Sequence, residues 1–160
     1  MKPLITMLLV LTMTSVALAD LNDTCDDAWY LIDQGFTAFD VDLCEYTNDY
    51  EGCGDMMASG PDAVWRALVE AGDDIELIAT TDGDFQVVMY LVTDCGDTVG
   101  SCVISSDGET NVQEIDWVVT ESNLYFLVID SVQGCGSVHV QMGGVLANQN
   151  SSWSDVKALY

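Results

Sequence analysis

Hydrophobic residues in this chain recur with a period of two over most of its length, which is the spacing of a β-strand with one buried face. In residues 36–46, FTAFDVDLCEY, apolar side chains at positions 39, 41 and 43 alternate with acidic ones at 40 and 42. Residues 62–70, 113–120 and 136–142 alternate in the same way, and a further strand candidate covers residues 75–81. A helix is indicated only over residues 26–34.

Two other segments are apolar on both faces. They are residues 85–94, FQVVMYLVTD, and residues 123–131, NLYFLVIDS, and both are rich in β-branched and aromatic residues. Central strands that are covered on both sides have this composition. Gly and Asp, which favour turns, stand between the segments. The sequence therefore predicts an all-β protein, a jelly-roll-like β-sandwich of about eight strands.

The two ends of the chain differ from its middle. Residues 1–19 combine Lys2, an apolar run and an Ala-Leu-Ala ending, which is typical of a secretory signal peptide. We therefore expect a signal peptide over 1–19, one domain over 20–142, and a linker with a C-terminal tail over 143–160. For the tail segment Trp153 to Tyr160 two interpretations remain open, a segment that docks on the sandwich or frays, and a recognition tag for export or attachment.

All six cysteines follow the predicted signal peptide, and an even number of cysteines in an exported chain predicts disulfides. Cys95 and Cys102 are close enough in sequence to join across the tip of a hairpin, and closing that loop is worth about 2.5 kcal/mol in the chain-entropy model. Zinc is not expected, because the chain lacks paired C-x-x-C spacings and has one His.

The charge of the chain is strongly one-sided, with 27 acidic side chains and three basic ones, for a formal net charge of −24. Such a surface cannot neutralise phosphates, so binding to nucleic acid or to anionic lipid is not expected. The acids have two interpretations: they keep an exported protein soluble, or some of them supply oxygen ligands for Ca²⁺.

Four segments, in order along the chain, resemble the bacterial pre-peptidase C-terminal domain family. They are LNDTCDDA (21–28), SGPDAVWRALVEAGDDIEL (59–77), FQVVMYLVTDCGDTVGSC (85–102) and SNLYFLVIDS (122–131). The first resembles the family's Asn-Asp-Thr opening, the second its Gly-Pro-Asp strand, the third a cysteine-closed hairpin and the fourth a tyrosine-bearing strand. The resemblance covers roughly residues 21–142.

This resemblance implies an extracellular β-sandwich, without catalysis of its own, in the medium or cell envelope of a bacterium. Because some members bind Ca²⁺, it implies Asn22, Asp23 and Asp62 as candidate metal ligands. It also implies a Cys25–Cys53 disulfide. Cys44 would then pair with Cys135 and tie an early strand to the last one, which are neighbours in many sandwiches.

The sequence offers few catalytic groups. His139, the only histidine, is expected to face outward from the last strand, and cysteines in disulfides cannot act as nucleophiles. Among the aromatic residues, Trp65 and Trp117 fall on apolar strand faces and are expected in the core. The others that could form an exposed ligand surface are Trp29, Tyr30, Tyr46 and Tyr50.

We therefore expect a non-catalytic exported module, with a binding or structural role, that engages an extracellular polymer or a protein partner. One alternative is a small carbohydrate-binding module stabilised by Ca²⁺. Another is a hydrolase that uses paired carboxylates.

Overall fold

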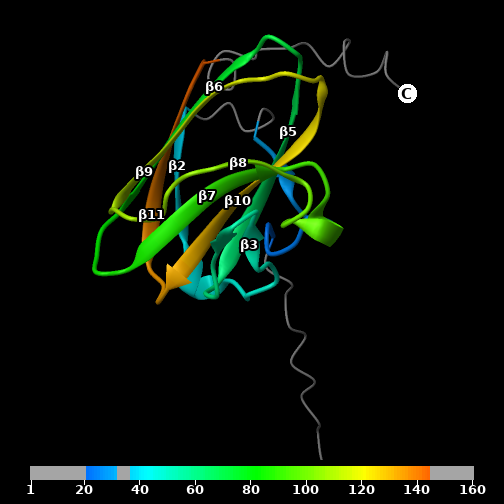
Figure 1. The fold of residues 1–160 in the computed structure, drawn as a ribbon. Coiled ribbons are helices and arrows are strands. Elements are labelled where there is room, and N and C mark those ends of the chain that lie inside the picture. Colours follow the sequence, from blue (N-terminus) through cyan, green and yellow to red (C-terminus); the bar gives the residue numbers. More distant parts are fainter. Residues whose placement is uncertain (1–20, 32–36, 145–160) are drawn as a thin grey trace, which may run out of the picture.

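The computed structural model describes residues 21–31 and 37–144, which form a β-sandwich of two main sheets (Figure 1). Sheet A has five strands in the order β1-β5-β10-β7-β8, and sheet B has four in the order β2-β11-β6-β9. The predicted all-β sandwich is confirmed. The predicted signal peptide and all but the first two residues of the predicted linker and tail lie outside the described residues. Among the described residues, no helix is long and apolar enough to cross a membrane.

The strands of five residues or more follow the predicted segments closely. The strands of sheet A are β1 (Trp29–Tyr30), β5 (Asp62–Val69), β10 (Asn123–Gln133), β7 (Gln86–Val92) and β8 (Cys102–Ser105). Those of sheet B are β2 (Ala38–Asp42), β11 (Ser137–Gly143), β6 (Asp74–Thr81) and β9 (Val112–Val118). A short hairpin consists of β3 (Gly52–Cys53) and β4 (Met56–Met57), and two 3₁₀ turns are η2 (Leu43–Glu45) and η3 (Cys95–Asp97).

Strand β1 corrects the helix predicted over residues 26–34. Trp29 and Tyr30 are extended and pair in parallel with Trp65 and Arg66 of β5. A two-residue strand carries too little pattern to be recognised in the sequence, and its conformation is set by the neighbouring β5. The other neighbours within the sheets pair antiparallel.

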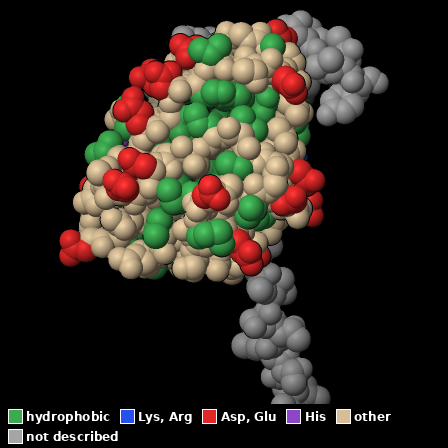
Figure 2. Space-filling model, in the orientation of Figure 1, with side chains coloured by type: hydrophobic (Ala, Val, Ile, Leu, Met, Phe, Trp, Pro, Cys, Tyr) green, Lys and Arg blue, Asp and Glu red, His purple; other side chains and the backbone are tan. Residues whose placement is uncertain are grey.

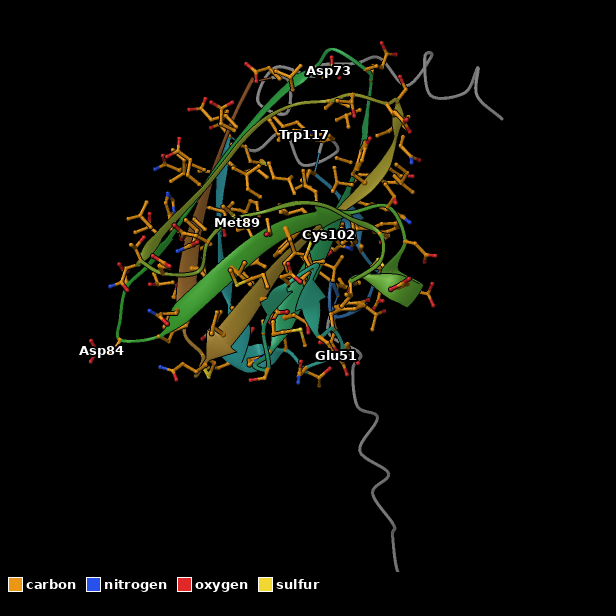
Figure 3. The ribbon with its side chains drawn as sticks, viewed as in Figure 1. Glu51, Asp73, Asp84, Met89, Cys102 and Trp117 are labelled. Atoms are coloured by element: carbon orange, nitrogen blue, oxygen red, sulfur yellow. A yellow bond between two sulfur atoms is a disulfide. The ribbon has the colours of Figure 1, made fainter. Side chains whose placement is uncertain are left out.

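The main core lies between the two sheets. Alternate residues of β5, including Ala63, Trp65 and Val69, face this core, and Leu77 of β6 and Ile115 of β9 meet them from sheet B. Burial of each such large apolar side chain stabilises the fold by about 1.5–3 kcal/mol relative to exposure. Trp117 packs at the edge of the core, toward the end of the sandwich that carries Asp73 and away from Glu51 (Figure 3).

A second apolar cluster covers the outer face of sheet A and explains why β7 and β10 are apolar on both faces. Val64, Tyr90 and Val128 contribute to it from the sheet, and Ala28 and Cys53 from the segments that lie over the sheet. These covering segments are the N-terminal residues 21–28 and the residues around β3 and β4. The outer face of sheet A is therefore a second buried layer.

Two of the three disulfides fasten this outer layer to sheet A, and they correct the sequence prediction. Cys25 pairs with Cys95, and Cys53 pairs with Cys102, so the predicted Cys95–Cys102 and Cys25–Cys53 bonds are wrong. The third bond joins Cys44 to Cys135, as predicted, with 5.0 Å between their Cα atoms.

The hairpin tip between β7 and β8 shows why Cys95 and Cys102 do not need to pair. The Oδ1 of Asp94 accepts a hydrogen bond from the N–H of Gly96 at 2.8 Å, and Ser101 Oγ donates to the carbonyl of Asp94 at 2.7 Å. The N–H of Ser101 donates to the carbonyl of Asp97 at 2.9 Å. Because these bonds close the tip, both cysteines are left to join other segments.

Candidate functional site

A groove of about 430 Å³ opens at one side of the sandwich, where the edge strand β1 of sheet A lies opposite the edge strand β2 of sheet B. Its walls are mainly aromatic and aliphatic. Besides the residues of β2, its lining includes Asn22, Trp29, Leu31, Tyr46 and Trp65. Trp29 is 41% exposed, which is unusual for a side chain of this size, and a concave, mostly apolar surface of this kind is typical of ligand sites.

Two aromatic rings form the base of the groove. Phe39 of β2 and Trp65 of β5 pack with 4.7 Å between their centroids and a 45° tilt, so they join the two sheets at this edge. Trp65 is 6% exposed and belongs to the core, as predicted, while Phe39 is partly buried. The base is thus held in place by core packing, and a ligand would meet a surface that is already formed.

The structure divides the predicted ligand surface of Trp29, Tyr30, Tyr46 and Tyr50. Trp29 and Tyr46 line the groove. Tyr30 instead lies under the guanidinium of Arg66, 4.3 Å from its carbon to the ring centroid, and the hydroxyl of Tyr50 accepts a hydrogen bond from the N–H of Cys25 at 3.0 Å. Sequence reasoning missed Phe39 as a groove residue, because its alternation marks it only as an inward-facing residue.

Acidic side chains stand beside the groove on the outer face of β2. Asp40 and Asp42 are exposed, and His139 of β11 pairs with Asp40 at 2.7 Å between Nδ1 and Oδ1. Gln141 lies 3.3 Å from the other ring nitrogen of His139. On the face drawn in Figure 2, acidic side chains lie mostly around the margins and hydrophobic ones gather in the middle.

A second unusual feature is a pair of carboxyl groups buried under the outer layer of sheet A. Asp62 of β5 and Asp130 of β10 are directly opposite each other in the antiparallel register, and both are 0% exposed. Asp62 Oδ2 accepts hydrogen bonds from the N–H groups of Asp49 and Tyr50, at 2.8 and 3.1 Å. Asp130 Oδ2 accepts one from the hydroxyl of Tyr90 at 2.9 Å.

The second oxygen of each carboxyl group, Oδ1, is buried and has no hydrogen-bond partner. Burial is the main reason that the pKa of Asp62 rises to about 7 and that of Asp130 to about 8. Directly opposite side chains in an antiparallel pair have Cβ atoms about 5 Å apart. Two carboxyl groups this close and this buried favour either a proton or a bound cation between them.

The structure places the predicted calcium ligands Asn22, Asp23 and Asp62 in three different hydrogen-bond roles. Asn22 Oδ1 accepts from the N–H of Trp29 at 2.7 Å, Asp23 Oδ1 accepts from the N–H of Thr47 at 2.8 Å, and Asp62 holds the 49–50 segment. In the described part of the chain, no group of three or more His, Cys, Asp or Glu residues is arranged to hold a metal ion. The calcium site stays a prediction.

Solved structures that are similar to this chain include the following two. The pre-peptidase C-terminal domain of a collagenase from Bacillus anthracis matches with a TM-score of 0.48 and 12% identity, over 67% of this chain and 88% of that one. CorA, a surface-associated copper-binding protein of Methylomicrobium album BG8, matches with a TM-score of 0.48 and 10% identity, over 73% of this chain and 96% of that one.

The first of these structures is a pre-peptidase C-terminal domain, and the sequence resembles that family. No family model matches the chain, and no curated protein matches its sequence.

Proposed function

We propose that this protein is an exported, non-catalytic binding module whose ligand, an extracellular polymer or a protein partner, lies in the groove between β1 and β2. The observation that carries this proposal is the exposed Trp29 above a base of aromatic rings held by the core. Aromatic side chains bury large areas on binding and lose little conformational freedom, so they dominate binding surfaces.

Export and the absence of catalysis are supported by the same structure. All six cysteines are in disulfides, which persist in oxidising compartments such as the medium or the bacterial cell envelope. No thiol is therefore available as a nucleophile. His139 is engaged by an exposed acid on the outer face of sheet B, and not by a Ser or Cys that it could activate.

The test is equilibrium binding of the secreted protein to purified extracellular polysaccharides and proteins. Trp29→Ala and Tyr46→Ala should weaken binding to the true ligand by about tenfold or more, as is usual for central aromatic residues. Met57→Ala is the matched control, because Met57 is also an exposed large apolar side chain, at 57%, but belongs to β4. Binding that Trp29→Ala leaves unchanged would assign the ligand to another surface.

The carbohydrate-binding alternative stabilised by Ca²⁺ is favoured by one specific observation, the two unpartnered oxygens of Asp62 and Asp130. Carboxylate oxygens are the preferred ligands of Ca²⁺, and two orphaned ones that face the same buried layer fit such an ion. The geometry favours Asp130 as the partner of Asp62, in place of Asn22. A bound cation would supply charge neutralisation there and fasten the 49–50 segment to sheet A.

Calcium titration followed by heat of binding and melting temperature tests this alternative. The melting temperature should rise with Ca²⁺ in the parent protein and in Asp116→Asn, which removes one exposed acid from β9, but should not rise in Asp130→Asn. If the parent protein gives no heat of binding and its melting temperature does not change, the protein does not bind Ca²⁺.

A further inference from the structure

The groove has a second property besides its aromatic walls, because one of its walls is a strand edge that no strand of residues 21–31 or 37–144 pairs with. Strand β2 pairs with β11 on one side and, among the described strands, is the last one of sheet B on the other. The N–H of Met142 donates to the carbonyl of Thr37 at 2.8 Å, and the N–H of Leu43 donates to the carbonyl of Gly136 at 3.0 Å. These two bonds fix which residues of β2 face β11.

In an antiparallel pair, the residues that bond to the neighbouring strand alternate along the chain. Thr37 and Leu43 bond to β11, so Phe39 and Val41 between them bond to β11 as well. Ala38 and Asp40 therefore direct their N–H and C=O groups to the opposite side, toward the groove. Both residues line it. Unpaired backbone groups at an exposed edge are a template for one more strand.

Side chains of an added strand would meet two different surroundings. Successive residues of a strand point to opposite faces of the sheet. Residues on the inner face would enter the groove, against Trp29, Tyr46 and Trp65. Those on the outer face would lie beside Asp40 and Asp42, which are exposed, and opposite charges on neighbouring strands stabilise the pairing.

From this arrangement we propose that β2 binds an extended segment of a partner protein in which apolar residues alternate with Lys or Arg. The inference rests on the proposed binding function and narrows the ligand to a protein segment that adds a strand to sheet B. A second copy of this chain fits less well. Two β2 edges side by side would bring the Asp40 and Asp42 carboxylates of both copies together, and like charges across a strand pair are destabilising.

The experiment uses the full secreted protein and a short peptide of alternating Lys and Val. A peptide with the same residues grouped in two blocks has equal charge, so it controls for general attraction to a chain of net charge −24. We expect the alternating peptide to bind at least tenfold more tightly than the block peptide. N-methylation of one alternate set of its residues should abolish binding, and N-methylation of the other set should not, because only one set of N–H groups faces β2.

Amide hydrogen exchange tests whether the bound peptide covers the exposed edge of β2. In the free protein the amides of Phe39 and Val41 should be protected and those of Ala38 and Asp40 should exchange fast; with the peptide bound, all four should be protected. On the protein side, Ala38→Pro removes one edge donor without touching a bond to β11 and should weaken peptide binding about fivefold. Asp116→Asn, on β9, should leave the affinity within twofold.

Three results would overturn the inference. One is equal affinity for the alternating and block peptides, and another is protection of Ala38 and Asp40 in the free monomer, which would mean that the chain itself covers the edge. The third is concentration-dependent protection without peptide, which would assign the edge to a second copy. If the alternating peptide fails while another ligand binds in a Trp29-dependent way, the proposed function survives and the added strand does not.

Discussion

Two buried acidic residues, Asp62 and Asp130, affect the stability of this molecule. Asp62 and Asp130 are polar groups in an apolar layer, and each satisfies one oxygen while the other stays buried without a partner. A free charge at such a site is costly, which is why burial moves the pKa of both groups upward. The pair therefore couples the stability of the outer layer to protonation or to a bound cation.

We predict that, in the presence of a metal chelator, stability falls as the pH rises from about 4 to about 8. The folded state holds protons on Asp62 and Asp130 up to pH of about 7 and 8, whereas unfolded Asp loses its proton near pH 3.9. Because the folded state binds more protons over this window, unfolding becomes easier by at most about 1.4 kcal/mol per pH unit for each group, and the loss ends above the folded pKa values.

Denaturant unfolding between pH 5 and pH 9 measures this dependence. Asp130→Asn should flatten the decline between pH 6 and pH 8, where ordinary surface carboxyls have already titrated. Asp116→Asn makes the same substitution at an exposed site and should keep the slope of the parent protein. Parallel curves for the two variants would contradict the prediction.

At the scale of elements, the alternation of apolar residues in the sequence was sufficient to predict the longer strands. It was not sufficient to predict the disulfides that join the segments. β2, β5, β9 and β11 follow the period-two segments, and β7 and β10 follow the two-faced apolar ones. β1, β3 and β4 are two residues each and have no pattern to read. The groove depends on β1 and β2 lying opposite each other, which is a property of the folded arrangement and not of any segment.

The disulfide pairing was missed for a related reason. Proximity in sequence favoured Cys95 with Cys102, but hydrogen bonds that Asp94 and Asp97 accept from Gly96 and Ser101 already close that tip. The pairing depends instead on the outer layer over sheet A, which places Cys25 against Cys95 and Cys53 against Cys102. A layer made by an irregular N-terminal segment and a very short hairpin has no periodic signal.

We predict that Cys95→Ser frees the thiol of Cys25, while Cys102→Ser frees that of Cys53. Alkylation under native and denaturing conditions, followed by peptide mapping, identifies the free thiol. Cys135→Ser should free Cys44 and serves as the control, since this pair was expected from the sequence as well. Alkylated Cys102 in the Cys95→Ser variant would refute the observed pairing. Loss of any one of these long-range bonds should cost about 4 to 4.6 kcal/mol in the chain-entropy model.

At the scale of the whole molecule, we expect the net charge and the exposed edge of β2 to determine which partners bind. A chain of net charge −24 repels copies of itself and attracts basic partners, more so at low ionic strength. We predict that binding of the alternating Lys and Val peptide weakens as salt is raised from about 50 to 500 mM, whereas its loss in Trp29→Ala persists at every salt concentration. Titration calorimetry at several salt concentrations measures both effects. An affinity independent of salt would mean that the acids beside β2 take no part.

The disulfides also have a consequence for the continuity of the polypeptide. Cys25, Cys44 and Cys53 all precede residue 54, and their partners Cys95, Cys102 and Cys135 all follow residue 94. A protease that cuts an exposed turn in between, such as residues 82–84, would therefore leave two fragments held together by three covalent bonds. They should separate on a gel only after reduction, and should stay joined even in a Cys44→Ser, Cys135→Ser variant. A single cut of the backbone anywhere between residues 54 and 94 therefore leaves the two fragments covalently joined.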